Sequence, residues 1–223
     1  MSRAEQFITK KNPAEVTLEW AGASDTGHFK YYDKEKKTNI PVKTLKFAVL
    51  TEMNCVRGWM EEAKSNAYSN EVSSTKNQTL TVKYFKDGKP KELISGKYAD
   101  IKGDLAKHGI KYNKVIYIMV IDCDELEVGT IAKILLKGAG AAAWFDVKEK
   151  QNVVVFDGFE DGLKGAVRYR YPRFAVEVIE TGDAEEAETA YEQVKEYFST
   201  QAHTAPVHVD PVVEEEDEDS MPF

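Results

Sequence analysis

Basic and aromatic side chains recur together on several stretches of this sequence whose residue pattern is typical of β-strands. Lysine and arginine can neutralise phosphate groups, and the flat rings of tyrosine and phenylalanine can stack on unpaired bases. Side chains two residues apart on a strand point to the same face of its sheet. Four stretches place such groups together in this way: Lys30 with Tyr32, Lys83 with Phe85, Tyr112 with Lys114, and Arg168 with Arg170, the last two alternating with Tyr169 and Tyr171.

The distribution of charge supports the same chemistry. The 223-residue chain has a net charge of −8, but residues 180–200 hold seven acids and one lysine, and residues 201–223 hold seven acids and no Lys or Arg. The remaining residues 1–179 therefore have a net charge of +5. A basic body with an acidic end is typical of a chain whose body contacts nucleic acid and whose tail contacts other proteins.

Each basic–aromatic pair also has a simpler interpretation. Aromatic side chains on strands commonly pack in the core, and lysines commonly keep an exposed face soluble. The recurrence of the pattern over several strands favours a groove for single-stranded nucleic acid. The densest basic region points the same way, since ten lysines stand against four acids between Lys76 and Val120.

No group of residues predicts catalysis, a metal or a cofactor. No phosphate-binding GxxxxGK[ST] motif is present, and the stretch 137–143 is better explained by small-residue helix packing. The acids of 122–127 are typical of a surface loop after a strand. The four histidines are scattered and have no metal-ligand spacing with a cysteine: His28, His108, His203 and His208. We therefore expect a non-enzymatic protein.

The cellular setting is expected to be a reducing cytoplasm. The two cysteines, Cys55 and Cys123, do not form a CxxC motif or a disulfide framework. The polar N-terminus lacks the pattern of a secretory signal, and no apolar run is long enough to cross a bilayer.

Hydrophobic periodicity predicts the elements that position these side chains. Strands are expected at 15–20, 28–33, 42–50, 79–85, 111–121, 152–156 and 166–180, and helices at 98–109, 139–148 and 183–198, the last with Asp183 as its N-cap. A short helix is expected within 55–72, and 129–138 is consistent with either strand or helix. An Asp-Gly pair at 87–88 predicts a tight turn, and Pro172 predicts a bulge or a sheet edge.

Short strands, few helices and no βαβ rhythm predict a mostly-β fold. We expect an OB-fold-like antiparallel barrel with extra strands and helices over residues 1–200. The apolar face of the helix at 183–198 can pack on the body or form a dimer, and packing on the body is favoured; the oligomeric state stays open. Residues 201–223 are expected to be a disordered acidic tail, since they combine a block of charge with little apolar content.

The chain end predicts a docking peptide. Six consecutive acids, Glu214 to Asp219, are followed by Ser-Met-Pro-Phe. A terminal phenylalanine offers a ring for an apolar pocket and an α-carboxylate for a basic one, and the acids speed encounter with a basic partner. The same acids can also compete with DNA for a basic groove. The candidate partner-binding residues are Asp217, Glu218, Asp219, Met221, Pro222 and Phe223.

Two parts of the sequence resemble known families. The ending DEDSMPF resembles the tails of bacterial single-stranded-DNA-binding proteins, although Ser-Met replaces the usual residues before Pro-Phe. The stretches Leu93–Val120 and Ile131–Val147 resemble phage-encoded single-stranded-DNA-binding proteins, which share a GK-aromatic-xxI helix, a K[YF]-x-[KR]-x-[VI]-Y strand and a small-residue-rich stretch ending in an aromatic. The positions that this resemblance carries over are Lys97, Tyr98, Lys111, Tyr112, Lys114 and Tyr117.

The resemblance implies an OB-type fold, sequence-nonspecific binding of single-stranded DNA, and a role in phage DNA replication, recombination or repair in the bacterial host cytoplasm. The tail would then recruit replication or recombination enzymes. Three alternatives stay open: a protein-interaction module that does not bind DNA, an OB protein that prefers RNA through contacts to its 2′-hydroxyls, and an enzyme on an all-β scaffold, against which the missing catalytic residues argue.

Overall fold

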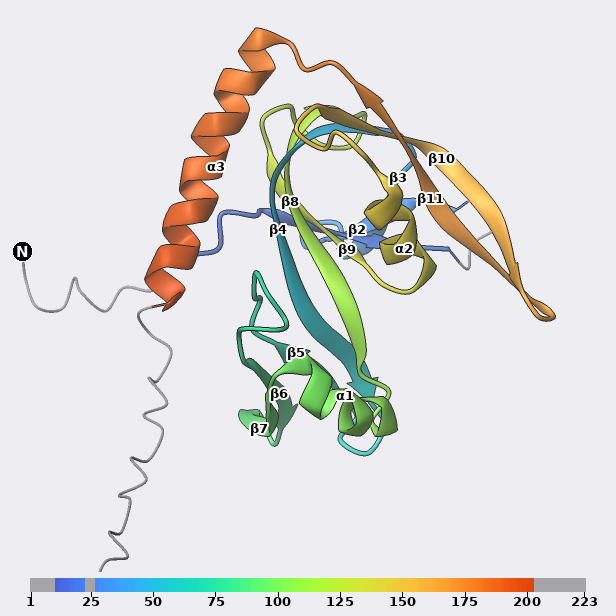
Figure 1. Cartoon of the computed structure of the whole chain (residues 1–223), viewed down its shortest axis with the longest axis vertical. Coiled ribbons are helices and arrows are strands. Elements are labelled where there is room, and N and C mark those ends of the chain that lie inside the picture. The colour runs from blue at the N-terminus through green and yellow to red at the C-terminus, as the bar shows by residue number, and fades with distance from the viewer. Residues whose placement is uncertain (1–10, 23–26, 203–223) are drawn as a thin grey trace, which may run out of the picture.

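The computed structural model describes residues 11–22 and 27–202, so the expectations for the tail at 203–223 lie outside the described residues. Within that part the fold is mostly β, as predicted, with eleven strands and three helices (Figure 1). The strands are β1 (Val16–Trp20), β2 (Phe29–Asp33), β3 (Thr38–Val42), β4 (Leu45–Met60), β5 (Ser65–Ser69), β6 (Leu80–Lys86), β7 (Lys89–Gly96), β8 (Lys111–Asp122), β9 (Ile131–Leu136), β10 (Val153–Lys164) and β11 (Val167–Glu177). The helices are α1 (Tyr98–Lys107), α2 (Ala139–Asp146) and α3 (Thr181–Ala202).

The strands form one open sheet in the order β3-β2-β1-β9-β8-β4-β5-β6-β7. The long strand β4 also pairs through its first residues with β10, which continues into the hairpin with β11. All neighbouring strands are antiparallel except β1 and β9, which are parallel. This open, mixed sheet confirms the β-rich class but does not establish the expected OB barrel.

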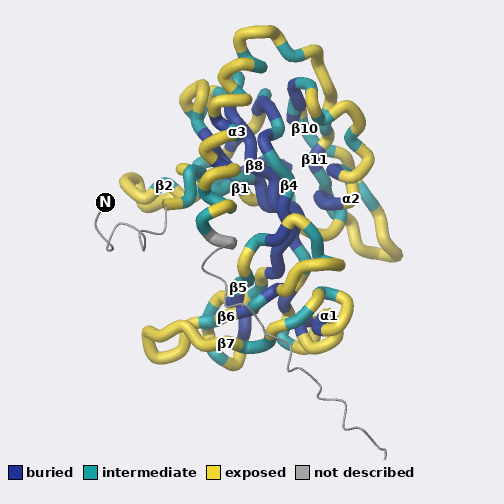
Figure 2. Tube along the Cα trace, turned by 60° about the vertical axis from the view of Figure 1, so that its left-hand side comes forward, coloured by how far each residue is buried: buried dark blue, intermediate teal, exposed yellow. Residues whose placement is uncertain are grey.

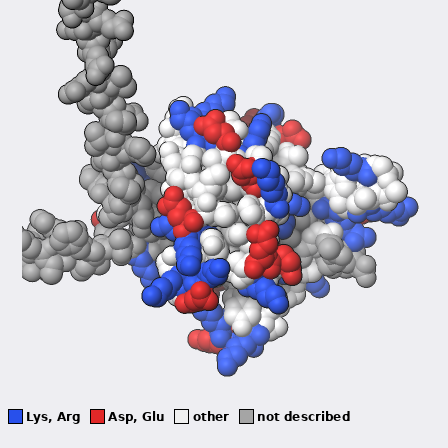
Figure 3. Space-filling view, turned by 90° about the horizontal axis from the view of Figure 1, so that it is seen from below, with Lys and Arg blue, Asp and Glu red and all other residues white. Residues whose placement is uncertain are grey.

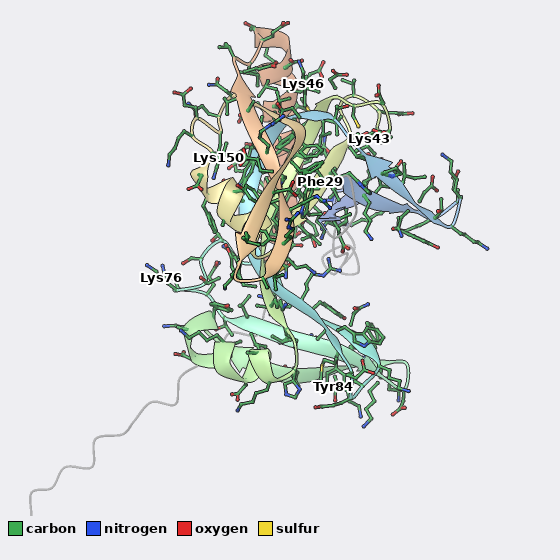
Figure 4. All side chains as sticks on the ribbon, turned by 90° about the vertical axis from the view of Figure 1, so that its right-hand side faces the viewer. Phe29, Lys43, Lys46, Lys76, Tyr84 and Lys150 are labelled. Carbon is green, nitrogen blue, oxygen red and sulfur yellow. The ribbon has the colours of Figure 1, made fainter. Side chains whose placement is uncertain are left out.

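The two longest central strands, β4 and β8, run from the upper part of the molecule to the lower part and carry a large share of the buried residues (Figure 2). One face of the upper sheet packs against α2 and the β10–β11 hairpin, and we call it the α2 face. Its core is aromatic: Phe29 points into it (Figure 4), the ring centroids of Phe29 and Phe156 are 4.8 Å apart, and Trp144 is fully buried. The opposite face packs against α3, and we call it the α3 face.

Helix α1 covers the lower sheet, formed by the end of β4 with β5, β6 and β7, on the same side as α2. Val56 and Val82 of the sheet pack there against Ile101 and Leu105 of the helix. Tyr84 lies half-buried at the edge of this cluster (Figure 4). The lower sheet thus buries one face under α1.

Helix α3 packs on the upper part of the α3 face, as its apolar spacing predicts. Ala190 and Val194 are buried against a cluster that includes Val115 and Met119 of β8, with Ala187, Tyr191 and Phe198 around them. The helix begins at Thr181 rather than after Asp183, so the expected N-cap is wrong and Asp183 lies in the first turn. A carboxylate in that position still complements the helix dipole.

Two further expectations need correction or completion. The short helix expected within 55–72 is wrong: β4 continues to Met60, a turn follows, and β5 begins at Ser65. The ambiguous stretch 129–138 contains the strand β9. The Asp87-Gly88 turn is confirmed, since positive φ angles of 54° and 73° at its two residues match a type I′ hairpin. Pro172 lies in the edge strand β11, opposite Phe159.

Candidate nucleic-acid interface

The lower part of the α3 face carries a row of polar side chains across four strands. Strand register places Lys111 opposite Arg57, Arg57 opposite Tyr68, and Tyr68 opposite Lys83. Directly opposed residues of antiparallel strands share a face, so these four side chains form one row. Among the described elements no helix packs on this row, and Arg57, Lys83 and Lys111 are exposed. The row therefore presents three cations around one aromatic ring.

Two exposed aromatic side chains lie next to this row on the same face. Trp59 and Phe85 are each two residues from a member of the row, and they are 52% and 46% exposed. The rings of Tyr68 and Phe85 are nearly parallel, with centroids 6.1 Å apart and an interplanar angle of 30°. The indole N–H of Trp59 donates a hydrogen bond to the carboxylate of Glu61. This bond holds one edge of the ring and does not cover its two faces. Flat, exposed rings of this kind suit base stacking.

A groove of about 610 Å³ continues this surface towards β1 and β2. Its lining includes Lys30, Tyr32, Arg57 and Lys133. The phenol of Tyr32 projects into solvent, since this residue is 57% exposed. Arg57 joins the groove to the row, because its guanidinium lies 3.6 Å from the carboxylate of Glu19 on β1. We call the combined surface the open face; it comprises Lys30, Tyr32, Arg57, Trp59, Tyr68, Lys83, Phe85 and Lys111.

Seen from below, Lys and Arg side chains are interspersed with groups of Asp and Glu over the described surface (Figure 3). Figure 3 also shows uncharged surface between these groups. This mixture of cations and uncharged surface fits a nucleic-acid strand, whose phosphates and bases need different neighbours.

Tyr117 does not belong to this interface, because it is fully buried beneath α3. Its hydroxyl donates to Glu71 at 2.7 Å and accepts from the amide of Asn12 at 2.9 Å. Glu71 also accepts from the ammonium of Lys133 at 2.9 Å, and the ring of Phe198 packs on Tyr117. This network joins the end of α3 to the sheet, so Tyr117 has a structural role and cannot stack on a base.

Lys114 is also removed from the interface by burial. It lies on the α2 face, 9% of its side chain is exposed, and its ammonium pairs with Glu52 at 2.8 Å. Lys150 contacts the same carboxylate at 3.2 Å. Burial raises the pKa of Glu52, but the hydrogen bonds and charges of the two lysines outweigh it and hold that pKa below its usual value. Lys114 therefore neutralises a carboxylate of its own chain.

Tyr98 and Tyr112 pack together on the α2 face, with ring centroids 5.7 Å apart. The hydroxyl of Tyr112 donates to the side-chain carbonyl of Asn54 at 2.6 Å, and burial raises the pKa of this tyrosine to about 12. Lys97 is exposed immediately before α1. The structure thus separates Lys97, Tyr98 and Tyr112 from Lys111, which lies on the opposite side of the sheet.

Arg168 and Arg170 lie on the β10–β11 hairpin, away from the open face. Arg170 pairs with Asp161 at 3.0 Å and stacks over the ring of Phe159, whereas Arg168 is exposed near the tip. The sequence predicted strand positions for five residues of the open face, of which Tyr32, Lys83, Phe85 and Lys111 are exposed and Lys30 is half-buried. It missed Arg57, Trp59 and Tyr68, which fall in the stretch interpreted as a helix. The tail residues 217–223 lie outside the described part of the chain.

A buried thiol, that of Cys55, and a half-buried phenol, that of Tyr112, predict that the folded protein is less stable at alkaline pH. Burial raises the pKa of Cys55 to about 12, as it does for Tyr112. A raised folded-state pKa contributes stability below the unfolded-state value, and this contribution is lost as the pH rises. We expect the free energy of unfolding to fall between about pH 9 and pH 12. In urea unfolding at a series of pH values, Cys55→Ala should make this slope shallower by about 1.4 kcal/mol per pH unit. An unchanged slope would contradict the assignment.

No group of three or more His, Cys, Asp or Glu in the described residues is arranged to hold a metal ion. No helix of the described part is long and apolar enough to cross a membrane. Comparisons with protein-family models, with curated proteins and with solved structures gave no significant match. Function is therefore inferred from the open face itself and from the sequence resemblance.

Proposed function

We propose that this protein binds single-stranded DNA along the open face, without strong preference for sequence. The observation that carries the proposal is one uncovered sheet face on which exposed aromatic rings and basic side chains alternate. Trp59, Phe85 and Tyr32 supply rings, and Arg57 with three lysines supplies charge. Such a surface can hold phosphates and bases of the same strand at once.

The chemistry of the open face favours single strands over duplexes. In a duplex the faces of the bases are stacked on one another, so an exposed ring on a protein has no partner there. In a single strand every base has a free face, and stacking on it depends little on which base it is. Rings spaced over several strands of the sheet therefore match a sequence-tolerant single-strand site.

The biological setting follows from the resemblance to phage-encoded single-stranded-DNA-binding proteins. We propose that the protein coats single-stranded DNA during replication or recombination in a bacterial cytoplasm. The acidic tail would bring partner enzymes to the coated strand through Pro222 and Phe223. The supporting observations for the tail are its seven acids and its apolar end.

Titration with a dT oligonucleotide tests the function directly. Trp59 is the most exposed of the three tryptophans, since Trp144 is fully buried and Trp20 is half-buried, so its fluorescence should be quenched on binding. The four basic residues of the open face predict that the logarithm of the binding constant falls with the logarithm of salt concentration with a slope of about −3.

The outcomes separate the alternatives. No binding at low salt to either dT or an equal-length rU oligonucleotide would leave a protein-interaction module as the better interpretation. Tighter binding to rU than to dT would indicate an RNA-binding protein, because only RNA offers 2′-hydroxyls. Tight binding to both duplex and single strand would contradict the stacking argument.

Removal of the acidic tail should strengthen DNA binding at low salt. A chain cut after Ala202 lacks seven acids that compete with phosphates for the basic residues of the open face. Ionic competition is screened by salt, so the difference from the full chain should shrink as the salt concentration rises. The matched control replaces the tail acids by their amides at unchanged length. Equal affinities of the full, cut and amide chains at low salt would contradict tail competition.

A further inference from the structure

The β10–β11 hairpin leaves the main sheet after a short pairing. β10 pairs with β4 only over Val153–Phe156, and from Asp157 to Lys164 its partner is β11 alone. Eight residues of strand extend for about 26 Å, and β1 contacts the hairpin as far as Arg170, opposite Asp161, so the residues beyond this pair form the projecting tip. Figure 1 shows it projecting from the body beside α2, with its turn at the far end.

The stem of this hairpin is firmly attached to the body. The indole N–H of Trp20 on β1 donates to the backbone carbonyl of Arg170 at 3.0 Å. Pro172 is buried next to Gly140 of α2. A Cβ added to Gly140 would lie 3.5 Å from the proline ring, so the helix and the hairpin are in close contact. A hairpin held in this way presents its tip in a defined position.

Two of the three acids between Asp157 and Lys164 form ion pairs within the stem. Arg173 pairs with Asp157 at 2.9 Å, and Arg170 pairs with Asp161 at 3.0 Å. The hydroxyl of Tyr171 donates to Glu160 at 2.7 Å, but a neutral hydroxyl does not cancel the charge of this carboxylate. The two ion pairs therefore reduce the repulsion between the stem and an anionic partner.

The tip has a different composition. Leu163 and Val167 are each 66% exposed, and both belong to the last two residue pairs before the turn. Lys164 and Arg168 flank them, and no ion pair between described residues includes either cation. Register places Leu163 opposite Arg168 and Lys164 opposite Val167. Opposed residues share a face, so each of the two faces of the tip has one aliphatic and one cationic side chain.

We propose that the hairpin tip is a wedge that enters the junction between duplex and single-stranded DNA. The aliphatic side chains would cover the last base pair and compete with its stacking, as apolar wedges do in proteins that unstack DNA. The cation on each side of the tip would contact the phosphates of the two diverging strands. This inference depends on the proposed function, because the released strand is captured by the open face.

The wedge adds something that the open face alone does not provide. A protein that binds only single strands shifts the melting equilibrium by mass action. Such a protein binds only after a thermal fluctuation has opened the end of the duplex. A wedge at the junction raises the rate at which the duplex end opens. The rate at which a DNA hairpin opens therefore tests the inference separately from the affinity for single-stranded DNA.

The experiment measures the opening rate of a DNA hairpin that carries a single-stranded tail and a fluorophore–quencher pair on its stem. The full-length double variant Leu163→Ser/Val167→Ser is compared with the wild type. The control Val128→Ser changes an aliphatic side chain of matching exposure, 65%, in the loop after β8. Binding of each protein to labelled dT is measured in parallel, and circular dichroism checks the fold.

We expect the double variant to bind dT with an affinity within about twofold of the wild type and to open the DNA hairpin at least fivefold more slowly. The control Val128→Ser should match the wild type in both measurements. A second variant, Lys164→Ala/Arg168→Ala, should slow opening in the same way. Equal opening rates for wild type and both variants, with dT binding intact, would overturn the wedge. Loss of binding to vesicles of anionic lipid in the tip variant, with unchanged DNA opening, would overturn it in favour of a membrane contact. Failure of the wild type to bind dT would instead refute the proposed function.

Discussion

The double variant Trp59→Ala/Phe85→Ala is expected to bind single-stranded DNA at least about 30-fold more weakly than the wild type. Each base that stacks on an aromatic ring contributes roughly 1–3 kcal/mol, so two lost rings remove at least about 2 kcal/mol. Both side chains are about half exposed, so their truncation leaves the buried core in place. The stability of the variant should therefore stay close to that of the wild type.

The anisotropy of a labelled dT oligonucleotide measures this affinity, because removal of Trp59 also removes the tryptophan whose fluorescence is expected to report binding. Phe145→Ala is the matched control: Phe145 is 52% exposed, as Trp59 is, but it lies on α2 on the opposite side of the sheet. The control should bind like the wild type. Equal losses in both variants, or none in either, would show that the open face is not where bases stack.

Much of the fold follows from short-range signals. Alternation of apolar with polar residues over Leu80–Tyr84 identifies β6, and the almost continuous apolar run of β8 marks a central strand. The Asp-Gly turn and the glycine after α1 carry positive φ angles, which their residue types permit at low cost. These features depend on residues close in the sequence, so one chain is enough to predict them.

Arg57, Trp59 and Tyr68 of the open face were not predicted, because local sequence signals misidentify the secondary structure of their stretch. The stretch from Cys55 to Met60 buries residues on both of its faces, so period-two alternation is hidden. The acids and lysine that follow it are typical of a helix, but they form the turn between β4 and β5, where Lys64 has a φ of 47°. Pairing of β4 with β8 up to Arg57, and with β5 up to Met60, overrides local preference here and brings Arg57 and Trp59 to the open face.

The lysines of β8 show the second limit. Spacing correctly places Tyr112 and Lys114 on one face, but it does not say which face is covered. The partner that decides the role of Lys114 is Glu52, 62 residues away in the sequence, and the register of β4 on β8 brings the two together. Lys111, three residues earlier, has no such burial and stays on the open face.

The second large effect concerns this buried ion pair. Glu52→Gln should lower the free energy of unfolding at pH 7 by about 2 kcal/mol, because it leaves the ammonium groups of Lys114 and Lys150 without their carboxylate. The value is below the roughly 3–5 kcal/mol of a fully buried pair, since the side chain of Glu52 is 28% exposed and partly screened. Binding of single-stranded DNA to the folded variant should not change. Tighter binding would show that Lys114 reaches the DNA after all.

Urea unfolding measures this loss, with Glu177→Gln as the control. Glu177 pairs with Lys46 at 3.0 Å, but both side chains are largely exposed, so no measurable change is expected there. Burial is therefore the variable that separates the two glutamates, whereas the ion-pair distances are similar.

The pH dependence distinguishes the ion pair from a simple packing effect. The lysines hold the folded-state pKa of Glu52 below its usual value despite burial. A lowered pKa contributes stability above the unfolded-state value of about 4.3, and that contribution is lost as the pH falls through the folded-state value. The gap in stability between wild type and Glu52→Gln should thus be full at pH 7 and narrow below about pH 4. A gap that stays constant down to about pH 3 would mean that shape, rather than charge, is what Glu52 contributes, because protonation would then cost the wild type nothing.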